Sequence, residues 1–175
     1  PPIFETIEPY RDHVFGARRE SVRFSDTGLP ASWPAANEII FDLNVTNLVN
    51  NGQKLAVLME DRIGSIQGYD ALDFTPNHIE TKGVGCVGRL AATNAFFGKA
   101  RVPVVATVAK DGVWMIDEQF GSEKLLGEDY FEGMNQDQLL KANCAYSKAD
   151  RLCYVAIPEA TDKALGRFAI LLAEI

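Results

Sequence analysis

Two adjacent carboxylates, Glu60 and Asp61, are the side chains of this sequence best suited to acid–base chemistry. They follow the apolar run LAVLM at residues 55–59, which would draw one of them towards a buried site. Burial disfavours the charged carboxylate and raises its pKa, as a general base near neutral pH requires. Neighbouring residues on a helix point about 100° apart, so at most one of the two would face such a site. The alternative is that both carboxylates face solvent.

A glycine triplet, Gly83, Gly85 and Gly88, lies in the stretch KGVGCVGRLAA and matches G-x-G-x-x-G. A dinucleotide-binding turn needs a buried strand before the first glycine. The preceding residues 77–82 contain a single aliphatic side chain, and the chain soon turns back in a hairpin. We therefore interpret the triplet as a flexible turn. Backbone N–H groups at Gly85 and Gly88, beside Arg89, remain candidates for binding an anion.

The three cysteines are Cys86, Cys144 and Cys153. Cys86 at a helix start would be a nucleophile, because the helix dipole favours the thiolate, but free cysteines are more often buried. An odd number excludes a complete intramolecular disulfide framework and favours a reducing compartment. With only His13 and His78 to add, a zinc site lacks ligands at the right spacing, so we expect no metal.

The composition is that of one globular domain covering residues 1–175, with 47% apolar and 23% charged residues. The net charge of −7 and a pI near 4.8 argue against nucleic-acid binding. No apolar stretch is long enough to cross a bilayer and no signal-peptide pattern opens the chain, so we expect a soluble cytoplasmic protein without a membrane partner.

Apolar periodicity and turn residues predict the elements that position these groups. Residues 102–120 form two β-rich runs around Lys110-Asp111-Gly112, which predicts a hairpin. Strands are also expected at residues 39–45 and 152–157, and helices at residues 9–22, 53–66 and 135–146. Residues 25–38 read as a loop, and residues 158–175 as a closing helix or a turn and strand. This mixture predicts an α+β domain with a mainly antiparallel sheet packed against or around a central helix.

Two segments, NGQKLAVLMEDRIG (51–64) and ATNAFFGKARVPVVATVAKDGVWMIDEQF (92–120), resemble the hot-dog thioesterase family. The resemblance implies an antiparallel sheet wrapped around a long central helix and hydrolysis of an acyl-CoA-like thioester. Gly52 would match the helix-opening glycine that binds the thioester carbonyl, and Glu60 or Asp61 the carboxylate that activates water. The strand that follows the helix in this family would correspond to the segment that contains Asn94, Phe96 and Phe97. Gln53 departs from the family where a second glycine is common.

Other features leave further functions open. The run VVATVAKDG (104–112) resembles the hairpin of flavin-binding split barrels, although in that family the hairpin lies nearer the N-terminus. Trp33, between two prolines in the long loop, is a candidate pocket lid or partner contact. The leading hypothesis is a homo-oligomer that binds a small apolar or acyl-like molecule through Gly52, Trp33, Asn94 and Phe97, without a cofactor. The main alternative is a non-enzymatic ligand-binding or interaction protein.

Overall fold

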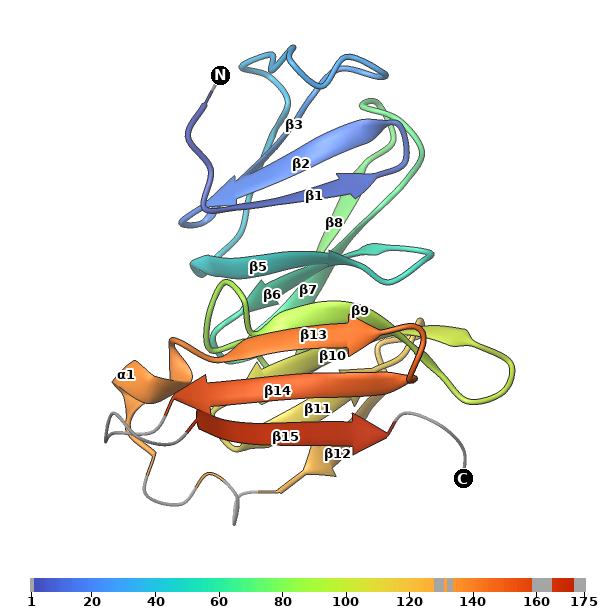
Figure 1. The fold of residues 1–175 in the computed structure, drawn as a ribbon. Helices are drawn as coiled ribbons and strands as arrows, with labels where there is room; N and C mark the ends of the chain where they lie inside the picture. The colour runs from blue at the N-terminus through green and yellow to red at the C-terminus, as the bar shows by residue number, and fades with distance from the viewer. Residues whose placement is uncertain (1, 128–130, 132–133, 159–164, 172–175) are drawn as a thin grey trace.

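The computed structural model describes residues 2–127, 131, 134–158 and 165–171, which form four small antiparallel sheets (Figure 1). The first sheet contains β1 (Thr6–Tyr10), β2 (His13–Arg18), β3 (Ser21–Phe24) and β4 (Glu38–Ile40). The second contains β5 (Val45–Asn50), β6 (Leu55–Met59), β7 (Arg62–Gln67) and β8 (Thr75–Lys82). The third contains β9 (Ala92–Phe97), β10 (Val102–Ala109), β11 (Gly112–Ile116) and β12 (Ser122–Leu126). The fourth contains β13 (Asn143–Ser147), β14 (Leu152–Pro158) and β15 (Leu165–Leu171).

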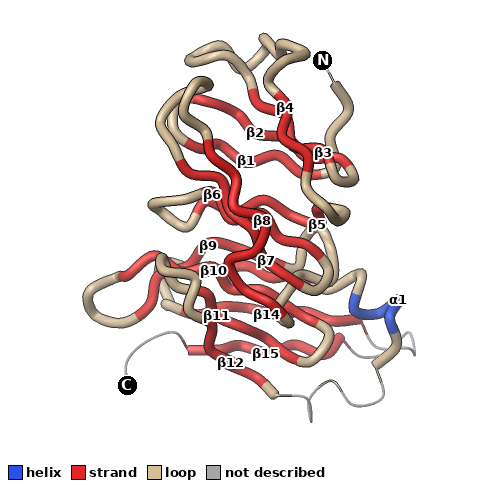
Figure 2. Tube along the Cα trace, turned by 180° about the vertical axis from the view of Figure 1, so that it is seen from behind, coloured by secondary structure: helices blue, strands red, loops and turns tan. Residues whose placement is uncertain are grey.

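The expected α+β fold with a central helix is wrong. Among the described residues the only helix is α1 (Gln136–Leu139), a single turn at the edge of the molecule (Figure 2). Asn135 caps it, and the Asn135 and Gln138 side chains bond each other's backbone N–H groups in a capping box. The described chain is therefore almost entirely β-structure, and it has no helix around which a hot-dog sheet could wrap. No helix in this part of the chain is long and apolar enough to span a bilayer.

Each sheet is a meander, in which every strand pairs with the strands before and after it in sequence. The sheets approach one another through their first strands, because β1 contacts β5, β5 contacts β9 and β9 contacts β13. In Figure 1 the sheets accordingly lie one below another in chain order, from the first at the top to the third and fourth at the bottom. Successive meanders joined in this way are arranged like the blades of a β-propeller.

The apolar run at residues 55–59 is strand β6, not part of the helix expected over residues 53–66. Leu55, Val57 and Met59 pack with the buried residues of the first sheet, whereas Ala56 and Leu58 pack with those of the third. A strand buried on both faces reads as a continuous apolar run, because neither of its faces meets water. The apparent helical stripe arose because the next strand, β7, also places Ile63 and Ile66 in the core.

Two other segments also form strands that the sequence did not predict. The helix expected at residues 9–22 is instead the end of β1, β2 and the start of β3. Along β2, the buried His13 and Phe15 flank the less buried Val14, while Gly16 and Ala17 are both buried. Residues 77–82 are the greater part of β8, although their polarity argued against a strand. Strand β8 lies at the outer edge of the second sheet and is largely exposed, so it needs few apolar side chains.

The hairpin predicted at residues 102–120 is confirmed. Strands β10 and β11 pair in antiparallel register, with Ala109 opposite Gly112 at the turn. Gly112 has a φ of 150°, and a Cβ there would overlap the Leu126 carbonyl oxygen, so a larger residue does not fit. The strand expected at residues 152–157 is also confirmed as β14, whereas the helix expected over residues 135–146 is limited to α1 and gives way to β13.

A partly buried ion pair stabilises the second sheet and makes its stability depend on pH. Glu80 accepts hydrogen bonds from Lys54 Nζ (2.7 Å) and Ser65 Oγ (2.6 Å), and its side chain is 14% exposed. Burial acts to raise the pKa of Glu80, but the hydrogen bonds from Lys54, Ser65 and Asn77 and the positive charge of Lys54 together outweigh it and hold the pKa below the ordinary value for glutamate. The folded state therefore favours the charged carboxylate.

We expect Glu80→Gln to lower the free energy of unfolding at pH 7 by about 1 kcal/mol, because a charge-assisted hydrogen bond is lost. A carboxylate whose pKa is lowered by folding stabilises the protein above its unfolded pKa and loses that effect as the pH falls through its folded pKa. The difference from the wild type should therefore shrink below about pH 4. Urea titrations at pH 7 and pH 3 measure this. A difference that does not depend on pH would contradict it, and Glu123→Gln on exposed β12 is the control.

Candidate functional site

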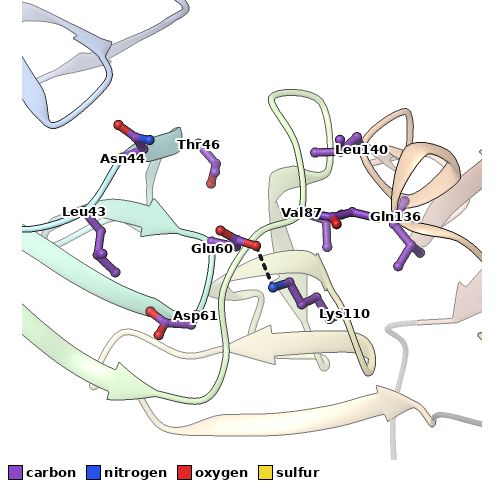
Figure 3. Close-up of a pocket in the computed structure, with 10 residues that line it drawn as sticks. Leu43, Asn44, Thr46, Glu60, Asp61, Val87, Lys110, Gln136 and Leu140 are labelled. Atoms are coloured by element: carbon purple, nitrogen blue, oxygen red, sulfur yellow. Dashed lines mark ion pairs between the residues drawn. The ribbon is translucent and has the colours of Figure 1, made fainter.

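A cavity of about 380 Å³ lies where turns of the second and third sheets meet α1 (Figure 3). Its walls come from residues 43–46 before and within β5, from the β6–β7 turn, from the β10–β11 turn and from α1 and the residue after it. The lining residues are Leu43, Asn44, Thr46, Glu60, Asp61, Val87, Lys110, Gln136, Leu139 and Leu140. The structure thus brings both predicted carboxylates to one cavity, although on a turn between strands and not on a helix.

The charged groups of the cavity stand at its rim. Lys110 Nζ lies 2.5 Å from Glu60 Oε1, and the two side chains are 57% and 55% exposed. Asp61 pairs with Arg62 Nε at 3.0 Å, and Arg62 also reaches Asp42 at 2.9 Å. Ion pairs this exposed contribute little to stability, because water screens them. A ligand can therefore replace their partners at small cost.

The glycine-rich loop forms the wall of the cavity at Val87. The Cys86 N–H donates to the Met59 carbonyl (2.8 Å), and the Val87 N–H donates to the Val108 carbonyl (2.9 Å). The loop thus bridges β6 and β10 on its way from the second sheet to the third. These two N–H groups are occupied within the protein and do not point at a ligand.

Gly85 and Gly88 are needed for close packing of this loop. A Cβ at Gly85 would overlap the Glu60 carbonyl group and would lie 2.5 Å from the Met59 carbonyl oxygen. A Cβ at Gly88 would lie 2.6 Å from the Leu140 carbonyl oxygen. Both glycines therefore lie directly against backbone that carries lining residues. Their proposed role in binding an anion stays a prediction.

Cys86 is fully buried, and burial raises the pKa of its thiol. The thiol donates a hydrogen bond to the Gly88 carbonyl oxygen at 3.1 Å. A buried thiol of raised pKa carries little thiolate and is a poor nucleophile. The surroundings of Cys86 therefore favour a structural role, as a small buried side chain, over a role as a catalytic nucleophile.

Three of the predicted substrate-binding residues lie away from the cavity. Gly52 is in the β5–β6 turn, at the opposite end of β6 from Glu60, roughly 15 Å or more along the strand. Trp33 packs against Phe4 in a tilted arrangement, with ring centroids 4.5 Å apart, beside the first sheet. Phe97, at the end of β9, packs against the buried core of the third sheet. The structure does not bring Gly52, Trp33 or Phe97 together with Glu60.

Arg89 and Asn94 line a second hollow, a polar groove of about 430 Å³ along the first strands of all four sheets. Arg89 pairs with Glu5 at 3.0 Å. Asn47 links the strands, because its Oδ1 accepts from Thr6 Oγ1 (2.9 Å) and its Nδ2 donates to the Arg89 carbonyl (2.8 Å). The predicted site residues are thus scattered. Glu60 and Asp61 line the cavity and Arg89 and Asn94 line this groove, whereas Gly52, Trp33 and Phe97 line neither.

No family model and no curated protein matches this sequence. Solved structures resemble it in fold. The extracellular domain described as that of a hybrid two-component system from B. thetaiotaomicron aligns with a TM-score of 0.55 and 9% identity, covering 95% of this chain and 22% of that one. PorZ, a surface component of the type-IX secretion system of Porphyromonas gingivalis, aligns with a TM-score of 0.46 and 15% identity, covering 95% of this chain and 21% of that one.

The chain thus spans about a fifth of the length of each of these structures. At 9% identity the likeness to the extracellular domain concerns the fold alone, and it supports the correction from α+β to stacked antiparallel sheets.

Sequence reasoning missed most residues of the cavity wall. The sequence predicted Lys110 as a turn residue but not as part of a site. The packing of the second sheet on the third places the β10–β11 turn beside the β6–β7 turn, and the local sequence does not show this packing. The apolar lining residues Leu43, Val87, Leu139 and Leu140 lie outside the strands or on the single helical turn. Their local sequence carries no periodic signal that marks a binding site.

Proposed function

We propose that this chain is a non-enzymatic binding module whose cavity takes a small molecule with an apolar body and a cationic amine. This proposal rests on one observation: the cavity is lined by both apolar side chains and carboxylates. Leu43, Val87 and Leu139 offer an apolar surface, and the Glu60 and Asp61 carboxylates stand at its rim. Ligand sites commonly combine a mainly apolar wall with a few polar groups that fix orientation.

The charge at the rim favours a cation. Among the described residues, two carboxylates, Glu60 and Asp61, and one ammonium group, Lys110, line the cavity. An ammonium group on the ligand can hydrogen-bond to either carboxylate, while the ligand's apolar part displaces water from the leucine side chains. The whole chain, with a net charge of −7, adds an attractive field for such a ligand.

Several features favour binding over catalysis. The ten described residues that line the cavity include no serine, cysteine or histidine that would act as a nucleophile or an imidazole base. Glu60 is paired with Lys110 and is more than half exposed, so its carboxylate lacks the desolvation that activates a general base. Gly52, which the thioesterase hypothesis needs beside the base, lies at the other end of β6.

The test is a binding titration against alkyl- and arylamines and against neutral and carboxylate analogues of the same size. We expect the amines alone to raise the melting temperature. In Glu60→Gln and Asp61→Asn their affinity should fall about tenfold, the effect of losing one charge-assisted hydrogen bond. In Lys110→Gln it should rise, because the one positive group among the described lining residues is removed. Glu123→Gln, which changes a carboxylate away from the cavity, should leave the affinity unchanged.

The proposal would be contradicted if the protein bound the carboxylate analogues in preference to the amines. It would also be contradicted if none of the three substitutions changed the affinity for amines. The same protein should be assayed for hydrolysis of acyl-CoA thioesters. Turnover that is lost in Glu60→Gln or Asp61→Asn would replace the binding hypothesis with the enzymatic one.

A further inference from the structure

Cys144 and Cys153 hold their sulfur atoms against each other in the fourth sheet. The two Sγ atoms are 3.3 Å apart, within a thiol–thiol hydrogen bond. Both residues lie on the β13–β14 hairpin, where Cys144 pairs with Val155 and Tyr146 pairs with Cys153. Residues 153 and 155 are two apart on one strand, so both cysteines project from the same face of the sheet. That face packs against the third sheet, because both are members of the buried core that joins the two.

We infer that Cys144 and Cys153 are a site of reversible oxidation, at which a peroxide converts the two thiols into one intramolecular disulfide. The sulfur atoms need to approach from 3.3 Å to about 2.05 Å for the bond to form. Because they lie diagonally across the hairpin and not directly opposite each other, the strands must adjust slightly at this point. The side chains already face each other, so no segment has to move across the molecule.

The two thiols differ in acidity, which sets the order of the two steps. Cys144 is 6% exposed and is among the residues that line the polar groove along the first strands, so hydrogen peroxide would reach the pair from the side of Cys144. Cys153 is completely buried behind it. The hydrogen bond with Cys144 lowers the pKa of Cys153, while the same contact and burial raise the pKa of Cys144. Cys153 is therefore the thiol of the pair that more readily becomes a thiolate.

The reaction balances in two steps. The Cys153 thiolate attacks one oxygen of hydrogen peroxide, the O–O bond breaks, and the hydroxide that leaves takes up the proton released by Cys153, so the products are a sulfenic acid on Cys153 and one water molecule. The Cys144 sulfur then attacks the Cys153 sulfur, the S–O bond breaks, and the hydroxide leaves with the proton from Cys144 as a second water. Two thiols are oxidised by two electrons, and one peroxide is reduced. A dithiol such as dithiothreitol reverses the bond by exchange.

The third cysteine provides the internal control. Cys86 belongs to the same core, but its thiol bonds to the Gly88 carbonyl and not to another sulfur. Three cysteines can thus give one bridge and one free thiol. The inference therefore predicts which thiol stays free.

Peptide mapping after mild peroxide treatment of the native protein tests this. Trypsin cleaves after residues 148 and 151, so a bridge appears as residues 142–148 joined to residues 152–163, while residues 83–89 carry Cys86. We expect the free thiols, counted in denaturant, to fall from three to one, with this single cross-link and a loss of two hydrogen atoms in intact mass. Dithiothreitol should restore all three thiols.

Two variants sharpen the result. Cys86→Ser should form the same cross-link at the same peroxide concentration. Cys144→Ser should instead accumulate a sulfenic acid on Cys153 that reacts with dimedone, because no second thiol is beside it. A cross-link to the Cys86 peptide, oxidation of either thiol of the pair without a bridge, or three free thiols after treatment that oxidises the unfolded chain would each overturn the inference.

Discussion

Replacing Gly85 with alanine is expected to destabilise the protein by about 3 kcal/mol. The new methyl group would overlap the Glu60 carbonyl and press on the Met59 carbonyl oxygen. Both obstacles are backbone atoms at the end of β6, and Met59 is itself fixed by its hydrogen bond from Cys86. The loop and the strand must separate for the methyl group to fit, and this would also displace the wall of the cavity.

Urea denaturation of the purified variant measures this effect. Gly127→Ala is the matched control, because a Cβ there meets no atom within 4 Å, and it should change the free energy of unfolding by less than about 0.5 kcal/mol. Equal stabilities for the two alanine variants would mean that the loop does not lie against β6 as described. The Gly85 variant should also bind amines more weakly than the wild type.

The second large effect is expected at Phe15, whose loss should cost about 3–5 kcal/mol. Phe15 is fully buried on β2, and its ring centroid lies 5.3 Å from that of Phe24 and 5.1 Å from that of Phe74. Phe74 precedes β8, so this cluster joins the first sheet to the second. Alanine at position 15 would leave a cavity between two sheets that neither can close alone.

The comparison is with Ile7→Ala on β1, an aliphatic truncation at a position 59% exposed, for which we expect a change below about 0.5 kcal/mol. Thermal and urea unfolding of the two variants give the difference directly. A loss below about 1 kcal/mol for Phe15→Ala would show that the aromatic cluster contributes far less than its burial indicates.

The sequence was sufficient to predict elements with strong local signals. The β10–β11 hairpin was predicted because a lysine, an aspartate and a glycine separate two runs of β-branched residues, and the structure confirms its register. Strand β14 was predicted from the short apolar run at residues 152–157. In both cases the information lies within about ten residues of chain.

The fold class could not be predicted in this way, because it depends on which faces are covered. The helical interpretation of residues 53–66 failed because β6 lies between two sheets, so the alternation that marks a strand is absent from its sequence. The repetition of four similar sheets was missed as well. Their first strands begin at residues 6, 45, 92 and 143, so the spacing grows from 39 to 47 to 51 residues and shows no fixed period.

The sequence predicted two residues of the candidate site but not the arrangement around them. Glu60 and Asp61 were found because two carboxylates after an apolar run stand out, and they do line the cavity. The expected helix would have placed them on a central element, whereas the structure places them on a turn, where sheet packing brings Lys110 to Glu60. Which residues meet across two sheets follows from tertiary contacts that no local pattern contains.

The glycine-rich loop also bears on how the molecule unfolds. In a row of sheets that touch only their neighbours, one end can open while the other stays folded, and cooperativity is weak. Residues 86–91 hydrogen-bond to β6 through Met59 and to β10 through Val108, and the Leu90 carbonyl accepts from the Cys144 N–H of β13. Detaching this segment breaks contacts of three sheets at once. The second, third and fourth sheets are thereby coupled into one cooperative unit.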